Sequence, residues 1–210
     1  MLGFIKKDLF LIKSNIKFLG ILLVIYSMMA YQGKMDISFL LPFMSIVLMM
    51  TTFNYDAYNK WDAYAITLPN GRKNSVKSKY LTTLLILIVT TLVITLISFG
   101  IAYFHTKVVD YESILMTMFG CVFATSILES FMYPAIYKFG VEKARIGIFI
   151  IIFGLALGFG YLAKYIDFSS KVSSLSFLEN YLIIIIPITM ALMLYVSYKI
   201  SERIYMKKEF

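Results

Sequence analysis

Residues Tyr80–Phe104 read YLTTLLILIVTTLVITLISFGIAYF, a run that contains no charged side chain. An α-helix rises about 1.5 Å per residue, so about 20 residues cross the ~30 Å hydrocarbon core of a bilayer. The run exceeds that length. It therefore predicts a helix that spans a membrane.

Five further apolar stretches lie on either side of this run, and short loops separate them. The six predicted spans are Lys17–Tyr31, Ile37–Phe53, Tyr80–Phe104, Ser113–Tyr137, Ile146–Ala163 and Tyr181–Lys199. Composition agrees, because the chain of 210 residues is 60% hydrophobic and 15% charged, with a mean hydropathy of +0.80. A soluble domain would expose far too much apolar surface. We expect an all-α membrane protein with six transmembrane helices in a single domain, residues 1–210.

The basic residues predict how the spans are oriented. Of the 20 lysines and arginines, 16 fall on one side of the predicted membrane, in the N-terminal segment, the second and fourth loops and the C-terminal segment. The other side has Lys34, Lys107, Lys164 and Lys171. The positive-inside rule then places both termini in the cytoplasm, which requires an even number of spans. The net charge of +8 is explained in this way, and no nucleic-acid partner is expected.

The N-terminal residues 1–16 show a helical apolar pattern of their own. Apolar side chains recur at steps of three and four, and lysines fall on the other side of the helix. The apolar positions are Leu2, Ile5, Leu9, Ile12 and Ile16. This pattern predicts an amphipathic helix in the cytoplasmic interface of the membrane. The alternative is a simple extension of the first span.

The longest cytoplasmic segment, residues 54–79, joins spans two and three and reads NYDAYNKWDAYAITLPNGRKNSVKSK. Asp56 and Lys60 are spaced to support a helix over Asp56–Leu68, on which Tyr58 and Trp61 share a face. Pro69-Asn70-Gly71 is a turn signal. Two interpretations stay open: a helix that transmits force from a docked partner into both spans, and an aromatic anchor at the level of the lipid headgroups.

Two blocks of this sequence resemble the ABC-2-type permeases, the six-span membrane subunits of bacterial ABC exporters. The first block is Trp61-Asp62-Ala63-Tyr64, Leu68-Pro69, Arg72-Lys73, Val76 and Lys79-Tyr80. The second is Tyr133-Pro134 and Tyr137-Lys138-Phe139-Gly140-Val141-Glu142-Lys143-Ala144-Arg145. Within that family, the chain is most similar to permeases of peptide exporters, including the phenol-soluble modulin exporters.

The resemblance implies a coupling helix that docks on a cytoplasmic ABC ATPase, and a second cytoplasmic contact after span four. The residues that it implies for coupling are Asp56, Tyr58, Trp61, Asp62, Tyr64, Leu68, Arg72, Lys138, Glu142 and Arg145. It also implies a second permease copy, identical or related. No G-x-x-x-x-G-K-[ST] motif is present, so ATP and Mg are expected on a separate ATPase and no cofactor in this chain.

The resulting hypothesis is a permease of an ATP-driven exporter in the bacterial plasma membrane, with an amphipathic substrate such as a phenol-soluble modulin or antimicrobial peptide. Catalysis has no support, because His105 and Cys121 stand alone and no cluster has metal-ligand spacing. The alternatives are a secondary transporter, which needs ionisable groups in several spans, and a membrane immunity or scaffold protein.

Two features inside the predicted spans are candidates for function. Glu129 is the acidic residue deep within a span, and we expect it either to contact a cationic part of the substrate or to hold span four to a neighbouring helix through Ser126 or Tyr133. In span five, Gly147, Gly154 and Gly158 lie on one face and allow a close helix approach. That approach is either packing within one chain or the seam of a dimer.

Overall fold

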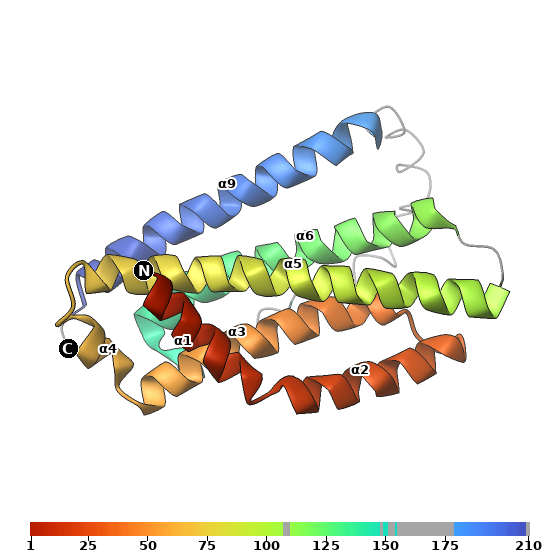
Figure 1. The fold of residues 1–210 in the computed structure, drawn as a ribbon. Helices are drawn as coiled ribbons and strands as arrows, with labels where there is room; N and C mark the ends of the chain where they lie inside the picture. The colour runs from red at the N-terminus through yellow and green to blue at the C-terminus, as the bar shows by residue number, and fades with distance from the viewer. Residues whose placement is uncertain (107–109, 148, 151–153, 155–178, 209–210) are drawn as a thin grey trace.

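The computed structural model describes residues 1–106, 110–147, 149–150, 154 and 179–208, and these residues form helices, turns and short connections without a strand. Figure 1 shows the arrangement. The helices are α1 (Leu2–Lys13), α2 (Ile16–Tyr31), η1 (Ile37–Phe39), α3 (Leu40–Tyr58), α4 (Trp61–Ala65), α5 (Gly71–Thr106), α6 (Tyr111–Phe139) and α9 (Glu179–Met206).

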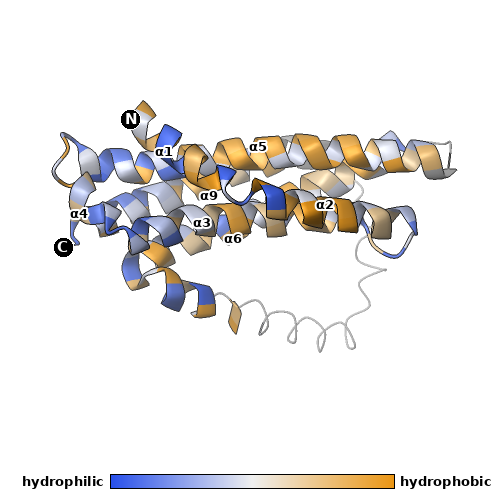
Figure 2. Ribbon diagram, turned by 60° about the horizontal axis from the view of Figure 1, so that its bottom comes forward, coloured by the Kyte–Doolittle hydropathy of each residue, from blue (hydrophilic) through white to orange (hydrophobic). Residues whose placement is uncertain are grey.

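The long helices lie side by side, and both termini are found at one end of the bundle, next to α4 (Figure 1). We call this the α4 end. Hydrophilic residues gather there, whereas the middle of the bundle is strongly hydrophobic (Figure 2). The polar α4 end and the apolar middle are what a bundle inserted in a bilayer requires.

Three of the described helices are long and apolar enough to cross a membrane: Ile37–Tyr58, Gly71–Phe104 and Tyr111–Phe139. The pair α1 and α2 forms a fourth candidate, bent by 56° at the break between the two helices. These four correspond to the first four predicted spans. The sixth predicted span lies within α9, and most of the fifth lies outside the described residues.

The bend after α1 favours a separate N-terminal helix over a straight extension of the first span. Its inward face carries Phe4, Asp8 and Ile12, which recur every four residues and are buried. Leu2 and Leu9 from the predicted apolar face are exposed. In a membrane protein, exposed apolar side chains at the interface can contact lipid, so the outward face of α1 suits an interfacial position.

The segment between α3 and α5 corrects the prediction of one helix over Asp56–Leu68. α3 continues through Asp56 to Tyr58, and Lys60 then adopts a left-handed backbone conformation with φ 50°. The helix that follows, α4, has only five residues. The polar residues after Gly71, predicted as a loop, form the first turns of α5. A left-handed residue ends regular helix geometry, which explains why the helix stops at this point.

Gly71 begins α5 at a very close approach to α4. A Cβ atom at this position would lie 1.7 Å from the carbonyl oxygen of Ala65, a distance that no side chain tolerates. The preceding residue, Asn70, has φ 55°, so the turn is tight. Glycine at position 71 is therefore required for α4 to lie against the start of α5.

We expect Gly71→Ala to displace α4 and to destabilise the protein by about 2 kcal/mol or more, as overpacking does. Gly100→Ala is the control, because it lies in the same helix with open space around the added atom. Thermal unfolding of the purified variants in detergent measures the difference. Equal melting temperatures for the two variants would contradict the close approach.

Candidate functional site

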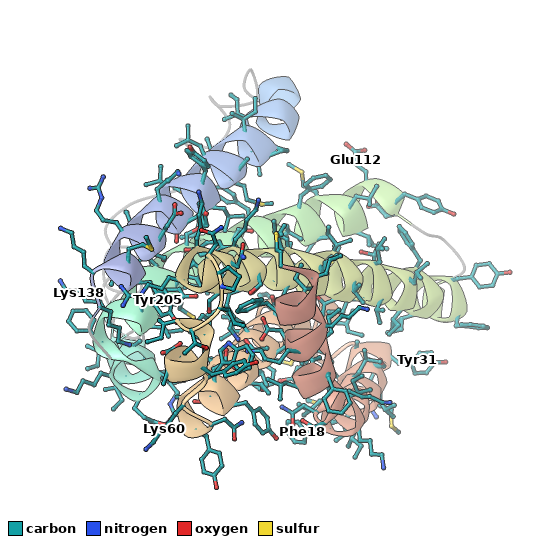
Figure 3. The ribbon with its side chains drawn as sticks, turned by 60° about the vertical axis from the view of Figure 1, so that its left-hand side comes forward. Phe18, Tyr31, Lys60, Glu112, Lys138 and Tyr205 are labelled. Atoms are coloured by element: carbon teal, nitrogen blue, oxygen red, sulfur yellow. The ribbon has the colours of Figure 1, made fainter. Side chains whose placement is uncertain are left out.

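Two tyrosines, one within the short helix α4 and one just before it in the sequence, are exposed. Tyr58 at the end of α3 is 86% exposed, and Tyr64 in α4 is 56% exposed. Lys60 is also exposed and projects outward (Figure 3). Ala65 is fully buried on the opposite side of α4. We call the exposed residues Tyr58, Lys60, Tyr64 and Ile66 the docking surface.

Trp61 connects α4 to the N-terminal helix. Its ring meets Phe4 edge to face, with ring centroids 5.7 Å apart, and the Lys7 ammonium lies 4.3 Å from the Trp61 ring centroid. Tyr64 lies beside it at 5.1 Å. The indole N–H is buried without a hydrogen-bond partner. These three contacts of Trp61 are aromatic or cation–π contacts, and two of them come from α1.

Behind Trp61 lies a buried ion cluster made of Lys7, Asp8, Asp56 and Lys79. The Lys79 ammonium lies 2.8 Å from Asp8 Oδ1 and 2.7 Å from Asp56 Oδ2. Lys7 pairs with Asp56 Oδ1 and lies 3.2 Å from Asp8 Oδ1. Two cations and two anions give the cluster no net charge. It joins α1, α3 and the start of α5.

The ion cluster is buried, and its pairing is therefore important for stability. Lys79 is only 3% exposed and also donates to the carbonyl of Thr52 at 3.1 Å, while Asp8 is fully buried. Charges away from water are tolerated when each has an opposite charge and further hydrogen bonds. Removing one partner of a buried pair costs about 3–5 kcal/mol. The cluster therefore fixes the relative positions of the three helices that meet there.

The other side of α4 is held by the end of α9. Tyr205 donates to Asp62 Oδ1 at 2.7 Å, and Arg72 donates to the carbonyl of Met206 at 2.6 Å. Tyr205 is fully buried among the helices (Figure 3). It lies beyond the predicted sixth span, and its burial, together with the nearby Asp62 carboxylate, raises the pKa of its phenol. The phenol therefore stays protonated and donates to Asp62.

The second predicted coupling segment lies at the same end of the bundle. Gly140, with φ 83°, ends α6 after Lys138, and Arg145 pairs with Glu142 Oε2 at 2.5 Å on the surface. A small cavity of about 80 Å³ is lined by Asp56 and Asp62 on one side and Gly140 on the other. The two predicted segments thus meet across a cavity. Lys138, Glu142 and Arg145 themselves are exposed.

The predicted coupling residues divide into two groups. Tyr58 and Tyr64 face outward, whereas Asp56, Asp62 and Arg72 have partners inside the protein. Leu68 is half-buried beside Gly71. Three residues of the ion cluster were not among the predicted site residues: Lys7, Asp8 and Lys79. A signal was present, because Asp8 is the one acidic residue among the first 35 residues and stands among four lysines.

Glu129 lies inside the bundle and is 2% exposed. It accepts a hydrogen bond from Ser45 Oγ of α3 at 2.6 Å. The hydroxyl of Ser126, which was one predicted partner, donates to the carbonyl of Val122 in its own helix. Glu129 therefore joins span four to span two. Contact of Glu129 with a substrate stays a prediction.

The three predicted seam glycines make no close approach where they are described. A Cβ atom added at Gly147 or Gly154 would meet nothing within 4 Å. Gly158 lies outside the described residues. Among the residues that the structure describes, Gly147 and Gly154 therefore have room for a close helix approach, and the dimer seam stays a prediction.

The fold defines a helical membrane protein whose α4 end is polar. A family model of the ABC-2 family transporter proteins matches residues 3–206, and the chain belongs to this family. It is therefore an ABC-2-type permease, and the family implies an ATPase partner and a membrane setting. No curated protein and no solved structure matches the chain.

The Glu129–Ser45 contact predicts a stability effect. Ser45→Ala leaves the buried carboxyl group without this donor and should lower the free energy of unfolding by about 1–3 kcal/mol. Ser27→Ala is the control, because the Ser27 hydroxyl bonds only the Leu23 carbonyl of its own helix. SDS titration in mixed micelles measures the free energy of unfolding of both variants. If Ser45→Ala unfolds at the same SDS fraction as Ser27→Ala, the contact contributes nothing.

Proposed function

We propose that this chain is the permease subunit of an ATP-driven exporter and that the docking surface on α4 binds a separate cytoplasmic ABC ATPase. One observation carries the proposal: Tyr64 of α4 and Tyr58 at the end of α3 are exposed, while the other side of α4 is fixed to three different helices. Those helices are α1 through Trp61, α5 through Gly71 and α9 through Asp62. A surface held in this way can pass movement from a partner to the bundle.

The alternative role for the aromatic residues is anchoring at the headgroup level. The neighbouring contacts favour docking, because Trp61 points into the protein toward Phe4 and Lys7. Membrane-anchoring tryptophans direct the indole N–H toward the headgroups. In this structure that N–H is buried. Trp61 is thus a packing residue behind the docking surface.

Transport would require two permease copies, ATP and Mg on the ATPase, and alternation between two states. ATP binding favours one state only where it makes different contacts in each. The two termini, together at the α4 end (Figure 1), agree with a cytoplasmic location for both. We place the complex in a bacterial plasma membrane, on the resemblance to peptide exporters and the distribution of lysines.

The substrate we propose is an amphipathic peptide, with phenol-soluble modulins as the leading candidate. Support comes from a cavity of about 390 Å³ beside α3. Its lining residues are mostly apolar, including Phe43, Met50 and Phe149, and also include the basic residue Arg145. Such a combination suits a molecule with one apolar and one polar side.

Tyr64→Glu tests the docking surface. A carboxylate at the centre of an interface should reduce the amount of ATPase that co-purifies with the tagged permease about tenfold or more, as losing a dominant contact does. Tyr111→Glu is the control, because Tyr111 is 62% exposed at the opposite end of the bundle. Mass spectrometry of the purified complex gives the ratio of ATPase to permease.

An unchanged ratio in Tyr64→Glu would rule out the docking assignment. Recovery of the unmodified permease without any ATPase, from membranes in which other complexes stay intact, would instead favour a secondary transporter or a scaffold protein.

A further inference from the structure

We propose that Lys79 is a positioning residue for the docking surface: it holds Asp8 and Asp56 so that Lys7 stays against Trp61, and this contact sets the position of α4. The inference deepens the proposed function and rests on it only where ATPase binding is concerned. Among the described residues, the hydrogen bonds and ion pairs of the Lys79 ammonium reach Asp8, Asp56 and Thr52, none of which lies in α4. It would act through Asp8, Asp56 and Lys7.

The geometry of the ion cluster is a closed ring of alternating charges. Asp56 offers one carboxylate oxygen to each ammonium, Oδ1 to Lys7 and Oδ2 to Lys79. Asp8 offers the same oxygen, Oδ1, to both. Its other oxygen, Oδ2, is buried without a hydrogen-bond partner. Asp8 therefore depends on the two lysines for its stabilisation.

Lys7 is the member of the ring that reaches α4. Its ammonium lies between the two carboxylates and the face of Trp61, 4.3 Å from the ring centroid. The side chain of Lys7 is less buried than those of the other three members. The position of the Lys7 ammonium is thus determined by two attractions, one to the carboxylates and one to the aromatic ring.

Removing the charge of Lys79 would upset that balance. Two carboxylates would then share a single ammonium in a buried site, and the site would carry one net negative charge. A buried charge without a partner draws in water or its remaining counter-ion. Lys7 would move toward Asp8 and Asp56 and away from the Trp61 ring, and α4 would lose one of its contacts with α1.

Trp61 is the one tryptophan in the chain, so its fluorescence reports on α4 alone. The experiment uses the full chain in mixed micelles of lipid and detergent, which contain no other tryptophan, without ATPase, and measures quenching of Trp61 by acrylamide. Lys79→Met keeps the length of the side chain and removes the charge. We expect the quenching constant to rise about twofold or more. Lys77→Met is the control, because Lys77 lies exposed on the same helix two residues away.

A charge-balancing variant separates positioning from general packing. Lys79→Met with Asp8→Asn leaves one ammonium and one carboxylate, Lys7 and Asp56, and should return the quenching constant close to that of the unmodified chain. A defect that came from packing would not be rescued by a second substitution in the same site. If Lys79→Met is not monodisperse, Lys7→Met provides the same test and should give the same rise.

Quenching in Lys79→Met equal to that in Lys77→Met, or a rise that Asp8→Asn does not reverse, would overturn the proposal. The same variants are then assayed for co-purifying ATPase, which should fall in Lys79→Met and recover in the double variant. Unchanged recovery of ATPase despite a shift in quenching would overturn the link to docking. Absence of ATPase from the unmodified chain would reject the proposed function but leave the fluorescence result standing.

Discussion

The pairing of Lys79 with two buried carboxylates is the constraint on which the α4 end depends. A lysine that is only 3% exposed needs opposite charges close to its ammonium, because the energy of an isolated buried charge is prohibitive. Asp56 comes from the end of α3 and Asp8 from α1, so both must approach the first turns of α5. The bend between α1 and α2 and the end of α3 lie beside the segments that bring these two carboxylates to Lys79.

A layer of tyrosines continues the polar contacts into the bundle. The Tyr80 hydroxyl lies 2.7 Å from Ser197 and 2.9 Å from Ser201, which joins α5 to α9. Tyr133 of α6 stacks on Tyr80 with centroids 4.1 Å apart. Farther from α4, the core consists of apolar residues of α3, α5 and α6, including Leu41 and Ile94. Hydrogen bonds and ion pairs thus fix the relative positions of the helices at the α4 end, whereas apolar packing holds the helices together in the rest of the bundle.

The sequence was sufficient for the helical class and for three of the predicted spans, or four if the bent pair α1 and α2 counts as one span. It also predicted that the segments around α4 and after α6 lie at one end. These features follow from the lengths of the apolar runs and the positions of the lysines, which can be read from each segment of the sequence by itself. The break at Lys60 was not predictable, because Asp56 and Lys60 fit the spacing of a helical pair equally well. Asp56 instead pairs with Lys7 and Lys79, 49 residues before it and 23 residues after it. Pairing between distant segments leaves no periodic signal in the sequence.

The shortness of α4 matters for the proposed function. A helix over the whole of Asp56–Leu68 would have a middle turn far from either fixed end and could bend under load. The five residues of α4 leave no such middle: Trp61 contacts α1, Asp62 contacts Tyr205, and Ala65 meets Gly71. Each of these three residues of α4 is thus held by a residue of another helix. Under the proposed function, force applied to Tyr64 by a docked ATPase would move α1, α5 and α9 together.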